Sequence, residues 1–162
     1  MIDEPRFREA LGRLLREVLQ GPAPDASFML NRGDRGLLAS LAQLSAAQAS
    51  ASPDGRGSVA AHVDHLRYGL SLLNRWALGD DPWGDADFSA SWARVHVTEQ
   101  QWRELREALA AETTAWSQAI DQPREWTRAS LTETIASVAH LAYHLAAIRQ
   151  IQPAAGGPPA KD

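Results

Sequence analysis

The spacing of apolar residues predicts helices along most of the chain, because apolar positions recur every three or four residues, the period of one helix face. The first such stretch runs from Asp3 to Gln20 and ends at Gly21-Pro22, a pair that terminates helices. A second stretch runs from Asp34 to about Ser50. No segment shows the strict alternation of a half-buried strand, so the pattern predicts an all-α fold.

Three further helices are predicted in the rest of the chain. The N-cap residue Ser58 opens a helix that runs to about Leu78, and a capping box starting at Thr98 opens one that ends near Asp121. A second capping box, Ser130 to Glu133, is expected to open the last helix, which runs to about Ile151. This last helix is apolar on most of its surface, so it should be central in the fold.

These elements predict a four-helix bundle over residues 34–151, with the first helix packed outside it. A single domain would then cover residues 1–151, and the Pro- and Gly-rich residues 152–162 would form a flexible tail. Residues 79–97 are a long loop between the second and third bundle helices. Because the loop contains Trp83, Phe88 and Trp92, we expect it to cover one end of the bundle.

Charge and composition exclude several classes of function. The formal net charge of the 162 residues is −4, whereas a general nucleic-acid binder needs a basic face. The chain has no cysteine, which excludes disulfides, thiolate zinc sites and a cysteine nucleophile. No apolar run approaches the roughly 18 residues of a membrane span, and no signal-peptide core follows the charged N-terminus. We therefore expect a soluble, cytoplasmic protein that binds neither nucleic acid nor membrane.

Four of the five histidines form two pairs at helical neighbour spacing. His62 and His65 lie three residues apart, and His140 and His144 lie four apart, so each pair shares one helix face. Two facing helices lie about 8–10 Å apart, which lets imidazoles from both meet between them. A shared divalent cation would satisfy these rings, and all-nitrogen ligation suits Zn, Ni, Fe(II) or Cu better than Mg or Ca.

The competing interpretation is structural, since a single histidine on an apolar helix face is more often a hydrogen-bonded core residue than a ligand. His96, in the long loop, is either an exposed loop residue or a lid residue that enters the open side of the site. Trp76 and Trp92 are expected near the mouth of a pocket, whereas Trp102 and Trp116 lie on a core stripe.

Two segments resemble the DinB/YfiT-like four-helix bundles, a family of metalloenzymes. One runs from Ser58 to Leu66 and has a helix-opening Ser-Val followed by a histidine that precedes a leucine. The other runs from His140 to Arg149 and contains the family's His-x-x-x-His. The resemblance covers roughly residues 37–151. It implies the three metal ligands His65, His140 and His144. His62 is then either a neighbour of the ligands or an alternative ligand.

The resemblance also implies a function. A site with three histidines and an open position would hold Zn, Ni or Fe, and would serve a hydrolase or a transferase or isomerase that uses a low-molecular-weight thiol. No Asp or Glu lies within four residues of His140 or His144, and Glu133 is assigned to the cap, so thiol chemistry is favoured. The alternative is a non-catalytic bundle in stress response or partner binding, with His62 as a fourth ligand and no pocket. Homodimers are common in the family.

Overall fold

The computed structural model describes residues 4–53, 55, 57–123 and 125–159. They form the α-helices α1 (Glu4–Gln20), α2 (Gly36–Ala42), α3 (Ala46–Ser50), α4 (Val59–Ala77), α5 (Glu99–Asp121) and α6 (Arg128–Ile151), and the short 3₁₀ helices η1 (Ala90–Trp92) and η2 (Pro153–Ala155). Within this described part no strand is present beyond one isolated bridge, so the all-α prediction is confirmed. No helix in it has the length and apolarity to cross a membrane.

The starts of α4 and α5 agree with the sequence, but the start of α6 does not. Ser58 caps α4, and Thr98 caps α5 in the predicted capping box. The predicted box at Ser130 is wrong, because Thr127 is the N-cap of α6 and Ser130 is its partner in the box. Glu133 is therefore not needed for capping and lies exposed in the second turn of α6.

The single helix predicted over residues 34–50 is two short helices. The Ser45 hydroxyl oxygen accepts a hydrogen bond from the Gln48 backbone N–H, and Gln48 Oε1 accepts one from the Ser45 backbone N–H. This capping box satisfies backbone groups locally and so starts α3 as a new helix after α2.

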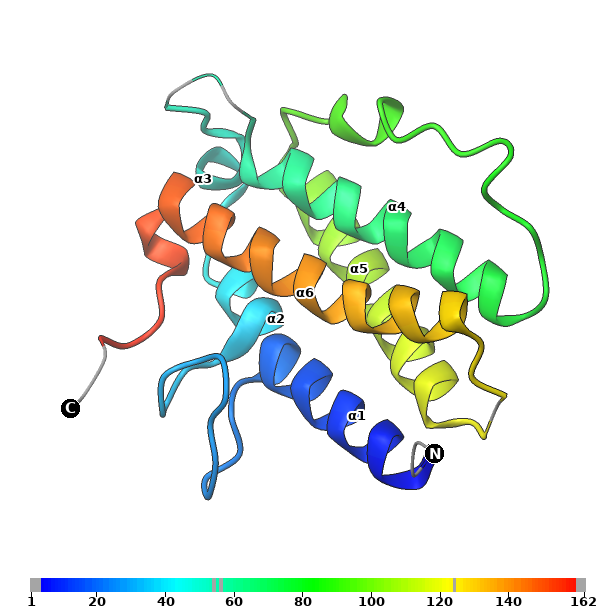
Figure 1. Ribbon diagram of the computed structural model, residues 1–162. Coiled ribbons are helices and arrows are strands. Elements are labelled where there is room, and N and C mark those ends of the chain that lie inside the picture. Colours follow the sequence, from blue (N-terminus) through cyan, green and yellow to red (C-terminus); the bar gives the residue numbers. More distant parts are fainter. Residues whose placement is uncertain (1–3, 54, 56, 124, 160–162) are drawn as a thin grey trace.

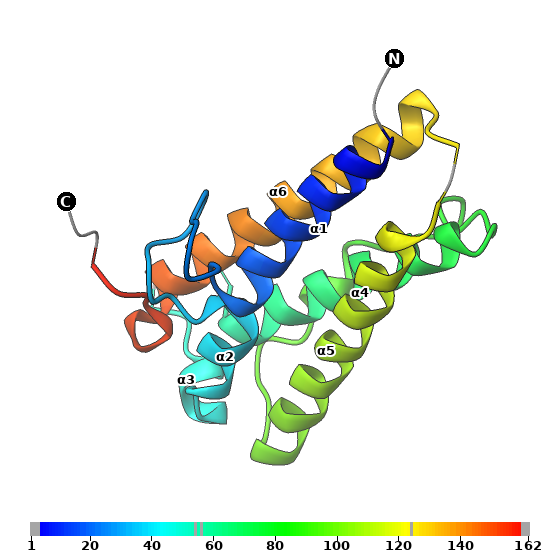
Figure 2. The same ribbon diagram turned by 90° about the horizontal axis from the view of Figure 1, so that it is seen from below.

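The four long helices α1, α4, α5 and α6 lie alongside one another (Figures 1 and 2). α4 contacts α5 and α6, and α1 contacts the same two helices. The expectation that the first helix packs outside is therefore wrong, since Leu11, Leu15 and Val18 are buried in the common core. α6 is less enclosed than expected, because Ile135 and Tyr143 on its outer face are exposed.

The long loop lies along α4 and does not cover one end of the helices (Figure 1). η1 packs on α4, and hydrogen bonds fix the loop at several points of that helix. The Arg94 guanidinium pairs with Asp64 at 3.0 Å, and the Asp87 N–H donates to the Tyr68 hydroxyl at 2.8 Å. The loop is thereby held over the helix that carries two of the histidines.

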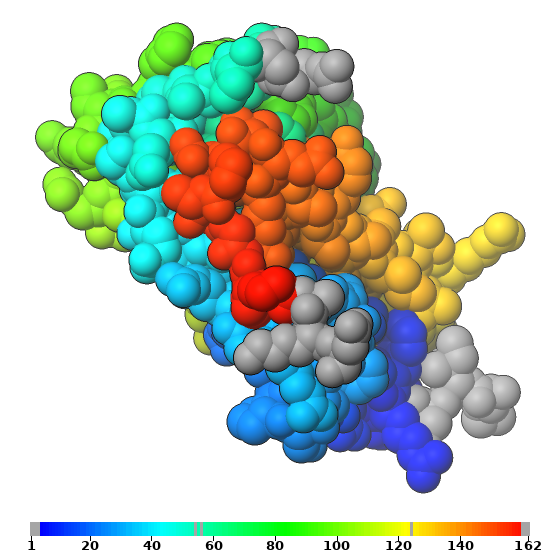
Figure 3. Space-filling view, turned by 90° about the vertical axis from the view of Figure 1, so that its left-hand side faces the viewer, coloured from blue at the N-terminus to red at the C-terminus, as the bar shows by residue number. Residues whose placement is uncertain are grey.

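The segment after α6 is packed in its described part, although the sequence predicted a flexible tail. Ala155 is buried, and its carbonyl accepts a hydrogen bond from Arg149. The Asn31 side chain donates to the Pro158 carbonyl, which places the C-terminal segment against the connector after α1 (Figure 3). Residues 160–162 lie outside the described residues.

The Arg149–Asp34 ion pair offers a test of this packing. The Asp34 side chain is only 2% exposed, and its Oδ1 lies 2.8 Å from Arg149 Nη2. Arg149→Met leaves a buried carboxylate without its cation, and we expect it to lower the free energy of unfolding by about 3 kcal/mol in denaturant titrations. The control Arg75→Met removes an exposed pair with Asp80 and should cost less than about 1 kcal/mol. Equal losses in the two variants would contradict this assignment.

Candidate metal centre

The packing of α4 against α6 brings three histidines together. His65 comes from the second turn of α4, and His140 and His144 come from the second half of α6. His140 Nε2 lies 2.8 Å from His144 Nε2 and 3.3 Å from His65 Nε2. One ring nitrogen of each histidine lies within 4.8 Å of the others, so this group can hold a metal ion. The histidines predicted as ligands thus converge at one point.

A serine in the loop fixes the tautomer of His65. His65 Nδ1 lies 2.9 Å from Ser91 Oγ, and the Ser91 hydroxyl donates to the Phe88 carbonyl at 2.6 Å. A hydroxyl carries one proton, so Ser91 Oγ must accept from His65 Nδ1–H. The neutral His65 ring then has its lone pair on Nε2, which faces the other histidines. Sequence reasoning missed Ser91, because one serine in a loop carries no signal of this contact.

The facing nitrogens of His140 and His144 must share one proton when no cation is bound. Two lone pairs or two N–H groups would repel each other at 2.8 Å, so one ring donates and the other accepts. Because His65 Nε2 is unprotonated, the three converging nitrogens hold a single proton among them. A divalent cation can replace that proton, because the exposed His140 ring can change tautomer and carry its proton on Nδ1, which leaves a lone pair on Nε2.

His62 lies beside this group and outside it. Its Nδ1 is 2.8 Å from His144 Nδ1, on the side of the His144 ring away from the converging Nε2 atoms. When His144 presents a lone pair at Nε2, its Nδ1–H donates to His62. Such a hydrogen bond from a ligand's second nitrogen orients the ring and raises its basicity. Of the two roles that the sequence left open for His62, the geometry favours that of a neighbour.

Two of the three nitrogen–nitrogen separations lie near the value expected around a tetrahedral cation. Zn–N bonds of about 2.0–2.1 Å place two ligand nitrogens roughly 3.3 Å apart. The His65–His140 separation already has this value, and the His140–His144 separation is shorter by about half an ångström, within reach of a small ring rotation. His65 and His144 are buried whereas His140 is exposed, so the group is accessible from the His140 side.

Burial keeps the inner histidines neutral at pH 7. Burial, together with the smaller effect of repulsion from neighbouring histidine cations, lowers the pKa of His65 to about 4 and that of His144 to about 3. Burial also lowers the pKa of His62. The neutral ring is the form that binds a metal, so the cluster is ready for a cation without losing protons from imidazolium groups.

Trp92 from η1 covers the α4 histidines. Its ring stacks on His65 with centroids 4.5 Å apart and meets His62 edge-on at 5.0 Å. Trp92 was predicted near the mouth of the pocket; it contacts the histidine rings but is not among the residues that line the cavity beside His140. His96 is exposed and is not among the described side chains that contact the histidine rings or line a cavity. The structure therefore gives no support for a lid role of His96.

An apolar cavity of about 210 Å³ adjoins the group at His140. Leu70 and Leu73 of α4 and Trp83 and Phe88 of the loop form much of its wall. α6 contributes His140 and Glu133 to the lining. The most exposed of the three converging histidines thus faces a space where a small molecule can bind.

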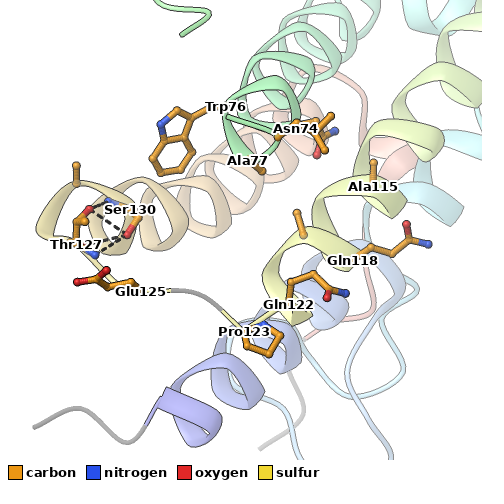
Figure 4. Close-up of a pocket in the computed structure, with 13 residues that line it drawn as sticks. Asn74, Trp76, Ala77, Ala115, Gln118, Gln122, Pro123, Glu125, Thr127 and Ser130 are labelled. Atoms are coloured by element: carbon orange, nitrogen blue, oxygen red, sulfur yellow. Dashed lines mark hydrogen bonds between the residues drawn. The ribbon is translucent and has the colours of Figure 1, made fainter. Parts of the chain in front are cut away.

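A larger cavity of about 860 Å³ lies away from the histidines (Figure 4). It is bounded by Trp76 at the end of α4, Gln118 of α5, and Thr127 and Ser130 at the start of α6. None of its lining residues is a histidine. Trp76, predicted at the mouth of the histidine pocket, belongs to this other cavity.

No family model, curated protein or solved structure matches the chain. The comparisons therefore neither support nor contradict the resemblance to the DinB-like bundles.

The lowered pKa values predict how the metal-free protein responds to acid. His65 and His144 take up protons near pH 6.5 when unfolded but only near pH 4 and pH 3 when folded. The unfolded state therefore binds more protons below pH 6.5, and the free energy of unfolding should fall as the pH drops from about 6.5 toward 4. Chelator-treated protein, unfolded in denaturant at several pH values, checks this. A His144→Gln variant should show a shallower decline over the same range, and an unchanged slope would contradict the assignment.

Proposed function

We propose that the protein is a metal-dependent enzyme that binds Zn, Ni or Fe through His65, His140 and His144. The convergence of three Nε2 atoms beside an apolar cavity carries this proposal. Four long helices, of which α1 and α4 each contact α5 and α6, and the His-x-x-x-His of α6 are consistent with a four-helix bundle of the DinB-like class, which is the class that we propose for the chain. A homodimer is part of the same proposal, supported by the exposed Ile135 and Tyr143.

The chain's own residues prepare the site for chemistry. Ser91 holds His65 in the tautomer that presents Nε2, and His62 accepts from the far nitrogen of His144. Trp92 stacks on His65 and keeps solvent from that side. A divalent cation at this point supplies Lewis acidity, which lowers the pKa of a coordinated thiol or water toward neutrality.

The arrangement favours a thiol-dependent transferase or isomerase over a hydrolase. Water-dependent hydrolysis calls for a general base within hydrogen-bond reach of the attacking water. Glu133, the carboxylate that lines the cavity, lies two helical turns from His140, about 10 Å along the axis. A thiol activated by the cation alone needs no such base. The substrates would be a low-molecular-weight thiol and a small electrophile.

The non-catalytic alternative is less well supported. A purely structural metal would have four protein ligands and no adjoining pocket. His62, the candidate fourth ligand, contacts the opposite nitrogen of His144, and a cavity lies beside the exposed His140.

Substitution of the histidines tests metal binding. After loading with one equivalent of Zn²⁺ and desalting, wild type should retain about one metal per chain, measured by elemental analysis. Metal content should fall well below one per chain in each of the variants His65→Ala, His140→Ala and His144→Ala. The matched control His96→Ala should retain about one metal per chain. His62→Ala should retain metal with affinity about 10–100-fold weaker. A full equivalent in His65→Ala would refute its role as a ligand.

Reaction class is tested by following two activities in parallel. Loaded protein should accelerate the loss of a small thiol in the presence of an epoxide or halogenated electrophile. The rate should drop at least about tenfold on chelation or in His140→Ala. Esters and amides should be hydrolysed slowly or not at all. Metal-dependent hydrolysis without thiol consumption would instead assign the protein to the hydrolases.

A further inference from the structure

We infer that the cavity beside His140 takes a thiol whose sulfur is separated by a short apolar body from a cationic group, and that Glu133 recognises this cation. The inference rests on the proposed function and names its class of thiol substrate. Glu133 acts in it as a specificity-determining residue that takes no part in the reaction.

The position of Glu133 supports this role. Glu133 and His140 are two turns apart on the same face of α6, so they stand at separate points of the cavity, about 10 Å apart along the helix. Thr127 and Ser130 cap α6 without Glu133. Within the described part of the chain, no hydrogen bond or ion pair engages its carboxylate. The charge is thus available to a ligand.

The wall between these two residues is apolar. Leu70 and Leu73 of α4 and Trp83 and Phe88 of the loop all line the cavity, and both aromatic rings are partly exposed. Ser137 also lines the cavity, but its hydroxyl donates to the Thr134 carbonyl and accepts from Trp116 Nε1. A ligand that spans the cavity therefore needs an apolar middle part, which would bury the Trp83 and Phe88 rings. At one end it needs a group that complements the Glu133 carboxylate.

Gly69 keeps one wall open. A Cβ built at this position of α4 would meet nothing within 4 Å, so a larger side chain has room to extend. Glycine inside a helix is destabilising relative to alanine, so a substitution here gains helix propensity. Gly69→Leu should fill the cavity and leave the histidines in place.

The experiment titrates Co²⁺-loaded protein with three thiols that share a six-carbon chain and follows the thiolate-to-cobalt absorption band. The probes are 6-aminohexane-1-thiol, hexane-1-thiol and 6-mercaptohexanoate. Wild type should bind the amine about tenfold more tightly than hexane-1-thiol, and the carboxylate most weakly. Glu133→Gln should remove the preference for the amine. The control Glu104→Gln, which removes an exposed carboxylate of α5, should keep it.

Two further outcomes separate this inference from the proposed function. Gly69→Leu should retain one Co²⁺ per chain and bind all three thiols at least about tenfold more weakly. If wild type binds no Co²⁺, the proposed function fails and the inference fails with it. If Co²⁺ and thiols bind but charge makes no difference, or Glu133→Gln keeps the preference, only the inference is overturned. Unchanged thiol binding by Gly69→Leu would also overturn it.

Discussion

The structure is organised around four imidazoles that are packed between α4 and α6. Without a bound cation, these rings carry too few N–H protons for every ring nitrogen to take part in a good hydrogen bond. Ser91 fixes the proton of His65 on Nδ1, and His140 and His144 share one proton across 2.8 Å. One of the three converging nitrogens is therefore an acceptor without a good donor. An unsatisfied buried acceptor lowers the free energy of unfolding by roughly 1–3 kcal/mol. Protonation cannot relieve this near neutral pH, because burial lowers the pKa of His65 and His144 far below 7. A divalent cation satisfies all three lone pairs at once.

The rest of the fold holds this group in place. The loop after α4 delivers Ser91 and Trp92 to the α4 histidines, and Asp64 anchors it through Arg94. On the other side, Trp116 Nε1 of α5 donates a hydrogen bond to the Ser137 hydroxyl of α6, one turn before His140. This bond helps to fix the position of α6 along α5. The space left between the loop, α4 and α6 is the small apolar cavity. The long loop thus supports the candidate metal ligands and also forms a wall of the proposed substrate site.

Local signals in the sequence were sufficient for the helices and the histidine group. The three- and four-residue spacings of His62 and His65 and of His140 and His144 follow from helix geometry alone, as do the caps at Ser58 and Thr98. The capping box at Thr127–Ser130 was assigned to the wrong residues, and the one at Ser45–Gln48 was missed. In both places the sequence also fits another helix boundary. The placement of α1 in the core and the contact of Ser91 with His65 depend on long-range packing, which no short pattern encodes. The sequence assigned Glu133 to the helix cap. In the structure Thr127 and Ser130 cap α6, so the Glu133 carboxylate is not used for capping.

We propose that three imidazoles from two helices hold one cation, with one coordination position left for a ligand. X-ray absorption spectroscopy of the Zn²⁺-loaded protein addresses it most directly, because it counts the imidazole rings around the metal and measures their distances. We expect three histidine nitrogens at about 2.0–2.1 Å from the metal, together with light, non-imidazole scatterers. A spectrum with four imidazoles and no further ligand, or with fewer than three, would contradict it.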